Sequence, residues 1–179
     1  MPVPTYFFLD TEWADEQGIE LVSLALVSED GAQEFYAERE HLSDDPTDFV
    51  KERVYPLLDR GDTLLSDDAM TSALRAFLSR VALPFVLADF PNDLKLFLHV
   101  LEGFPFGASS ASRRSMALVT TLMCRDEKTT ALLERWFAMH PREAARRHHA
   151  LVDARALRMA WLAATSRPGG EWSGPAEQE

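Results

Sequence analysis

The sequence has little cysteine, a shortage of basic residues and no long apolar run. Cys124 is the single cysteine among 179 residues, so no disulfide can form within the chain, and an intracellular protein is expected. No apolar stretch approaches the roughly 20 residues that span a bilayer, and the N-terminus lacks the basic region of a signal peptide. We therefore expect a cytoplasmic protein with no membrane segment.

Lysine and arginine are outnumbered by acidic residues, 18 to 29, which gives a formal net charge of −11. This charge argues against a protein that coats long nucleic acid through many phosphate contacts. It does not exclude an enzyme that grips a few nucleotides at one strand end, because clustered carboxylates can bind cations that reverse the local charge. The length and the hydrophobic content of 46% suit one domain over residues 1–165. The Pro-, Gly- and Glu-rich residues 166–179 are expected to be a disordered tail.

The order of expected elements predicts an α/β fold. Three strands should form an antiparallel meander, at residues 5–9, 19–28 and 33–37. The short apolar run 84–88 is expected to be a buried fourth strand, parallel to the first. The period of residues 116–123 fits either a strand or a short helix. Helices are expected at residues 43–58, 69–80, 93–101, 128–139 and 150–165. A mixed sheet of antiparallel and then parallel strands, flanked by helices, is typical of a ribonuclease-H-like fold.

Two carboxylates follow the apolar run of the first strand, in the stretch FFLDTEW. Asp10 and Glu12 are two residues apart, so in a strand their side chains would point to the same side. A divalent cation would relieve their repulsion, because carboxylate oxygen suits hard ions such as Mg²⁺ or Mn²⁺. A strand that ends in a polar turn is the alternative, and this stretch taken alone favours it. The rest of the chain has to decide between the two.

Two further acidic positions occur at expected helix starts. Asp93 follows the buried fourth strand, with Asp89 as its rival on the same turn. The helix dipole favours a carboxylate there, and the end of a sheet is a common ligand site, although an ordinary helix-start aspartate is the alternative. Asp153 lies in the first turn of the last helix, and His148 precedes it by five residues on a loop. A histidine on that loop can reach over a site to which the aspartate contributes. Solvent exposure is the alternative for this histidine.

These motifs in this order resemble the DEDDh 3′–5′ exonucleases, the family of the proofreading subunit of DNA polymerase III, RNase T and oligoribonuclease. The resemblance runs from residue 6 to residue 161. Within the family the chain is most similar to small bacterial and phage exoribonucleases of the RNase AS type, in the stretches FLDTEW, IELVSLALVSEDG, FVKERVYPLL and HHALVDARAL. The chain departs from the family pattern at Trp13, where a small or polar residue is usual, and in offering both Asp89 and Asp93 for the second motif.

The resemblance implies a metal-dependent exoribonuclease that removes 5′-nucleoside monophosphates from the 3′ ends of single-stranded RNA. Two Mg²⁺ or Mn²⁺ ions would be held by Asp10, Glu12, Asp93 and Asp153. The general base would be His148, which takes a proton from the attacking water. A sister group places a tyrosine base four residues before the last aspartate, at the position of His149 here, but the five-residue spacing favours His148. The RNase AS type suggests adenylate-rich RNA, and relatives of this kind are often homodimers.

Three residues are candidates for contact with the substrate: Thr11, Trp13 and Arg147. Trp13 could stack on a terminal base or belong to the core. Arg147 could meet the incoming phosphates together with Arg142 and Arg146, or lie on a solvated helix face. Two rival functions stay open. One is the same chemistry on DNA, and the other is a nuclease-fold module that binds nucleic acid without cutting it.

Overall fold

The computed structural model describes residues 3–104 and 119–167. The predicted tail therefore lies largely outside the described residues, as does most of residues 103–114, a stretch whose glycines and serines predict a loop. Among the residues described, no helix is long and apolar enough to cross a membrane.

A six-stranded mixed sheet forms the centre of the protein, in the order β4-β3-β2-β1-β5-β6. The pairs β1–β2 and β2–β3 are antiparallel, whereas β1–β5, β5–β6 and β3–β4 are parallel. The predicted α/β class with a ribonuclease-H-like arrangement is confirmed. The strands are β1 (Thr5–Trp13), β2 (Leu21–Ser28), β3 (Glu34–Arg39), β4 (Leu64–Leu65), β5 (Pro84–Ala88) and β6 (Thr120–Met123).

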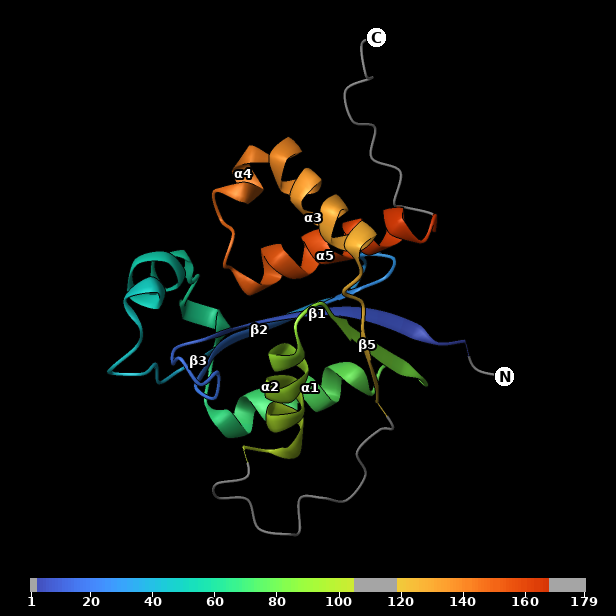
Figure 1. Ribbon diagram of the computed structural model, residues 1–179. Coiled ribbons are helices and arrows are strands. Elements are labelled where there is room, and N and C mark those ends of the chain that lie inside the picture. The colour runs from blue at the N-terminus through green and yellow to red at the C-terminus, as the bar shows by residue number, and fades with distance from the viewer. Residues whose placement is uncertain (1–2, 105–118, 168–179) are drawn as a thin grey trace.

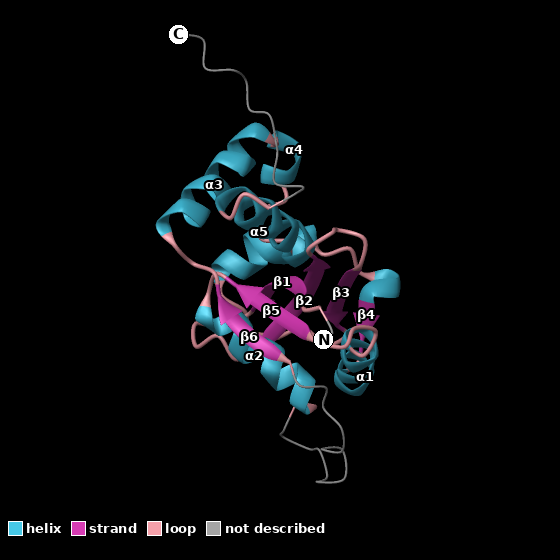
Figure 2. Ribbon diagram, turned by 90° about the vertical axis from the view of Figure 1, so that its right-hand side faces the viewer, coloured by secondary structure: helices cyan, strands magenta, loops and turns pink. Residues whose placement is uncertain are grey.

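Within the described part of the chain, five α-helices cover both faces of this sheet. Figure 1 shows α1 and α2 on one face and α3, α4 and α5 on the other, and Figure 2 shows the same layers from the side. The helices are α1 (Asp67–Leu78), α2 (Pro91–Glu102), α3 (Glu127–Met139), α4 (Pro141–Ala144) and α5 (Ala150–Ala164). The strand β2 is therefore buried along its whole length, as the apolar character of both of its faces predicts.

Side chains of β1 alternate between these two helical layers. Phe7 and Leu9 belong to the apolar core that includes residues of α1 and α2. Phe8 instead packs with Leu157 of α5, and its ring lies tilted against that of Trp161, with 5.3 Å between the ring centroids. Because the strand period is two, the positions that follow Phe8 on the α5 side are 10 and 12. The helical layer of α5 therefore lies over the carboxylates of β1.

Two parts of the chain differ from the sequence prediction, and the structure decides a third part for which the sequence left strand and helix open. The first strand continues to Trp13 rather than ending at residue 9, so Asp10 and Glu12 lie inside it. The helix expected over residues 43–58 is wrong in its length and regularity, since it is a π-helix η1 (Val50–Val54) followed by a 3₁₀ turn η2 (Tyr55–Leu57). Pro56 explains the change, because it has no N–H for an α-helical bond and fits the start of a new turn. The described part of the ambiguous segment 116–123 is the strand β6.

Candidate metal centre

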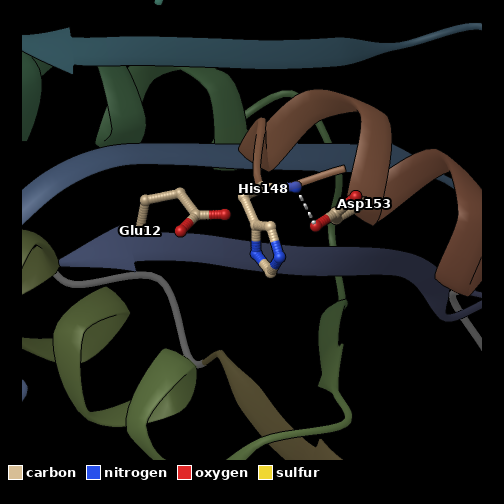
Figure 3. Close-up of side chains that lie close together, drawn as sticks. All are labelled: Glu12, His148 and Asp153. Carbon is tan, nitrogen blue, oxygen red and sulfur yellow. Dashed lines mark hydrogen bonds between the residues drawn. The ribbon is translucent and has the colours of Figure 1, made fainter. Parts of the chain in front are cut away.

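Six ligand-type residues meet where β1, α2 and the start of α5 come together. One group is Glu12, His148 and Asp153, drawn in Figure 3, and in it one ligand atom of each residue lies within 4.8 Å of the others. The second group is Asp10, Asp89 and Asp93, with the same spacing. The two groups lie side by side because Asp10, in one group, and Glu12, in the other, are neighbours on one face of β1.

The two groups are brought together by the ends of three elements. Asp89 directly follows β5, which is parallel to β1, and Asp93 lies in the first turn of α2. Asp153 lies in the first turn of α5. Helix N-termini carry partial positive charge, which favours the carboxylate forms of Asp93 and Asp153.

Asp93 is held in place by β1 itself. The hydroxyl of Thr11 donates to Asp93 Oδ1 at 2.7 Å, and the Thr11 N–H donates to the same oxygen at 3.2 Å. Both residues are buried, at 2% exposure each. Thr11, expected to contact substrate, thus has its hydroxyl engaged inside the protein by a carboxylate of the site.

The carboxylates strain one another electrostatically. Burial raises the pKa of Asp10 well above its ordinary value, and the charges of Asp93, Asp153, Glu12 and Asp89 raise it further. Burial also raises the pKa of Glu12, with Asp153 and Asp93 as the next causes. The pKa of Asp93 and that of Asp153 rise to about 7, again mainly through burial. Without a cation this cluster therefore binds protons near neutral pH.

A hard divalent cation fits this site. Among the described residues, Asp10 Oδ2 and Asp153 Oδ1 are buried oxygens without a hydrogen-bond partner. Such orphaned acceptors are costly unless a proton or a cation satisfies them. The donor set is five carboxylates and one imidazole, which suits Mg²⁺ or Mn²⁺. The acidic groups could thus bind metal ions, as expected from the sequence.

His148 lies at the mouth of the acidic cluster. Its backbone N–H donates to Asp153 Oδ2 at 3.0 Å, and Figure 3 shows this bond with Glu12 on the other side of the ring. Its φ is +76°, a left-handed conformation that typically costs an L-residue about 1–2 kcal/mol. Burial lowers the pKa of His148, and the charges of Arg147 and Arg53 lower it further. The ring is therefore neutral near pH 7 and able to accept a proton.

The neighbouring His149 points elsewhere. It is buried at 2% exposure and stacks on Tyr36, with 4.6 Å between ring centroids. Its Nε2 lies 3.3 Å from Asp59 Oδ2. Of the two adjacent histidines, His148 is the one at the carboxylates. For the other open choice, Asp89 or Asp93, the structure brings both aspartates to Asp10.

A pocket of about 200 Å³ opens over the carboxylates and has one aromatic wall. Trp13 stacks on Phe90 there, with 5.9 Å between centroids and 16° between ring planes. Trp13 also packs partly against the α1–α2 core, whereas Phe90 is 45% exposed. Trp13 therefore lines the pocket, as a residue that stacks on a base would, and it also packs against the core. Sequence reasoning missed Phe90, although its position between Asp89 and Pro91 places it beside the second motif.

The predicted basic residues have partners of different kinds. Arg147 lines the pocket, binds Glu134 through both terminal nitrogens and lies 4.8 Å from the Phe137 ring centroid. Arg146 donates to Asp59 Oδ1 at 2.8 Å. Arg142 is exposed, outside the residues that line the pocket. Of the three arginines, Arg147 is the one that lines the pocket.

Comparison with known proteins adds nothing to this geometry, since no family model and no curated protein matches the chain.

Proposed function

We propose that the protein is a divalent-metal-dependent 3′–5′ exonuclease whose substrate is single-stranded RNA. The observation that carries this proposal is the meeting of β1 carboxylates with carboxylates from α2 and α5 beside a neutral histidine. The pKa values of all five carboxylates in this cluster are raised, and perturbed pKa values cluster at functional sites.

Four residues would hold two Mg²⁺ or Mn²⁺ ions: Asp10, Glu12, Asp93 and Asp153. When bound, such ions lower the pKa of a water and stabilise charge on the phosphodiester during hydrolysis. Asp89, within reach of Asp10 and Asp93, can support the same ions or their waters. Thr11 keeps Asp93 turned towards this cluster through its two hydrogen bonds.

His148 would act as the general base. Its lowered pKa leaves the imidazole unprotonated at neutral pH, so it can take a proton as water attacks phosphorus. The bond that breaks joins phosphorus to the 3′ oxygen of the preceding nucleotide. That oxygen takes a proton from solvent, so the products are a 5′-nucleoside monophosphate and a strand one nucleotide shorter with a 3′ hydroxyl. Asp153 holds the His148 backbone while the ring stays free for this transfer.

The pocket walls suit a strand end. The Trp13–Phe90 pair offers an aromatic surface on which a terminal base can stack, a contact typically worth about 1–3 kcal/mol. Arg147 supplies a positive charge at the same pocket. The resemblance to RNase AS-type enzymes is the basis for proposing RNA as the substrate and adenylate-rich ends as the preferred ones.

A labelled-strand assay tests the proposal. A 5′-labelled short RNA and the matching DNA are incubated with the protein in Mg²⁺, in Mn²⁺ and in EDTA, with Asp10→Ala alongside. A ladder that shortens from the 3′ end, and that disappears in EDTA and in the variant, is the expected result. Comparing oligo(A) with oligo(U) of equal length measures the base preference. Full activity of Asp10→Ala would refute the scheme, and faster cleavage of DNA would move the substrate to DNA. Binding without cleavage of either strand would favour a non-catalytic module.

A further inference from the structure

One carboxylate outside the pocket contacts the chain on both sides of His148. Asp59, which follows the η2 turn, accepts a hydrogen bond from Arg146 at Oδ1 (2.8 Å). Its Oδ2 lies 3.3 Å from Nε2 of the buried His149. The His149 N–H donates to the Arg146 carbonyl at 3.1 Å, which closes a turn with His148 inside it. Asp59 therefore contacts both ends of the turn that carries the candidate base: it accepts a hydrogen bond from Arg146, and it lies beside the His149 ring without a hydrogen bond of ordinary geometry.

The backbone at Asp59 is held by Glu38, a buried residue of β3. Its N–H donates to Glu38 Oε1 at 2.7 Å, and the next N–H, that of Arg60, donates to Glu38 Oε2 at 3.1 Å. Glu38 is fully buried and also accepts from the Tyr36 hydroxyl at 2.6 Å. The Tyr36 ring stacks on His149. The sheet thus supports the turn through Glu38 and Asp59, and also through Tyr36.

The turn needs such support. His148 has a φ of +76°, a conformation that a residue with a Cβ avoids unless its surroundings impose it. Its own contacts are the backbone bond to Asp153 and an edge-on contact with the Phe49 ring, 4.9 Å between centroids. Phe49 is 50% exposed, so this second contact restrains the ring only from one side. The contacts made by Asp59 fix the residues on which the conformation of His148 depends.

We propose that Asp59 is a positioning residue that holds the Arg146–His149 turn so that His148 faces Glu12 and Asp153. Among the described residues, neither Asp59 nor His149 belongs to those lining the pocket, so this role is separate from metal or RNA contact. The catalytic consequence rests on the proposed function, whereas the structural consequence does not.

The first test measures amide hydrogen exchange at His148 by NMR in the full chain. Asp59→Ala removes both contacts, and Asp59→Asn keeps an oxygen that can accept from Arg146. Glu29→Ala is the matched control, because it breaks a comparable ion pair, Glu29–Arg167 at 2.6 Å, away from the turn. We expect exchange at His148 to become about tenfold faster in Asp59→Ala, with smaller changes in Asp59→Asn and none in the control, at matched global stability.

The second test measures kinetics on short RNA. Asp59→Ala should lower kcat about tenfold with little change in KM, and Asp59→Asn should restore most of the rate. In a His148→Ala background, Asp59→Ala should have no further effect, because the group that it positions is gone. A merely structural role would lower activity by the same factor in both backgrounds.

The outcomes separate this inference from the proposed function. Unchanged His148 exchange in a folded Asp59→Ala protein would overturn it, as would equal losses in the two backgrounds. If Asp59→Ala does not fold, Arg146→Ala decides by the same criteria, since that side chain is 45% exposed and its loss leaves the core intact. If the wild-type protein cleaves no nucleic acid, the proposed function fails, and the exchange measurement alone decides the role of Asp59.

Discussion

The Thr11 hydroxyl donates to Oδ1 of Asp93 across 82 positions of the sequence, at 2.7 Å. This bond joins the middle of β1 to the first turn of α2 and turns one carboxylate towards Asp10. It also lowers the pKa of Asp93, in opposition to the larger effect of burial. The residue between the two β1 carboxylates thus helps to keep a third carboxylate ionised.

Replacing Thr11 by valine tests this bond. Thr11→Val keeps the shape and the backbone hydrogen bond but removes the hydroxyl donor, so the pKa of Asp93 should rise further above its ordinary value. Because a protonated carboxyl binds cations poorly, Mg²⁺ affinity at pH 7 should fall about tenfold, the order expected for one hydrogen bond to a charged group. Calorimetric titration measures the affinity. Thr11→Ser, which keeps the hydroxyl, is the control, and equal affinities for the two variants would contradict the prediction.

The stability of the metal-free protein should fall as the pH rises from about 4 to about 7. Asp93 and Asp153 have a folded-state pKa of about 7, above the unfolded value near 3.8, so the folded state binds more protons in this range. Their contribution to the free energy of unfolding is fully present below the pKa of the unfolded state, and it is lost as the pH rises through the pKa of the folded state. Thermal unfolding in EDTA at several pH values measures this loss.

Three histidines act in the opposite sense within that window, so a variant is needed to isolate the carboxylates. The pKa values of His99, His148 and His149 are lowered by folding, so their contribution to the free energy of unfolding grows as the pH rises towards 6.5. Asp10→Asn removes one of the repelling charges without touching the histidines. We expect it to be more stable than wild type at pH 8 in EDTA, by on the order of 1–3 kcal/mol, with a weaker pH dependence. A destabilised Asp10→Asn protein would show that the cluster is not strained.

Divalent cations should stabilise the folded protein. A cation at one hundred times its dissociation constant contributes about 2.7 kcal/mol, which corresponds to roughly 5–10 °C in Tm for a chain of this size. The shift should appear with Mg²⁺ or Mn²⁺ at pH 8 and be much smaller in Asp10→Asn. Asp62→Asn, at an exposed acidic position away from the pocket, should respond like wild type. Equal shifts in both variants would place the cation elsewhere.

The Trp13–Phe90 stack leads to a prediction about KM. Phe90→Ala removes an exposed ring, so the fold should be kept while KM for short RNA rises about 5–150-fold, the range that one stacked base implies. Trp13→Ala should raise KM as well, with an added loss of stability because Trp13 packs partly against the core. Trp13→Phe keeps an aromatic face and serves as the control. Unchanged kinetics in Phe90→Ala would remove the ring from substrate binding.

Local pattern alone predicted the strands β1, β2, β3 and β5 and most of the helices, whereas β6 was left open between strand and helix and the two-residue strand β4 was not predicted. The alternation in β1 is a two-residue period, so the sequence could place Asp10 and Glu12 on one face before any contact was known. Asp93 and Asp153 were placed at helix starts by the same kind of short-range signal, and both lie there. The irregular form of the helical segment η1–η2 was not predicted. It depends on Pro56 together with the packing of Val50 and Val54 against Val22 of β2, and this packing joins residues far apart in the sequence.

Tertiary structure decided which of these side chains meet. His148 and His149 are adjacent, and the turn that sends one ring to the carboxylates and the other to Tyr36 depends on a left-handed φ supported from β3. The bond between Thr11 and Asp93 and the stack of Trp13 on Phe90 join β1 to the β5–α2 connection, far along the chain. The spacing of apolar residues in a sequence has a period of two in strands and of three to four in helices, so it predicts which side chains share a face of one element. The meeting of distant groups is instead set by how α2 and α5 dock on the sheet, through burial that no local pattern encodes.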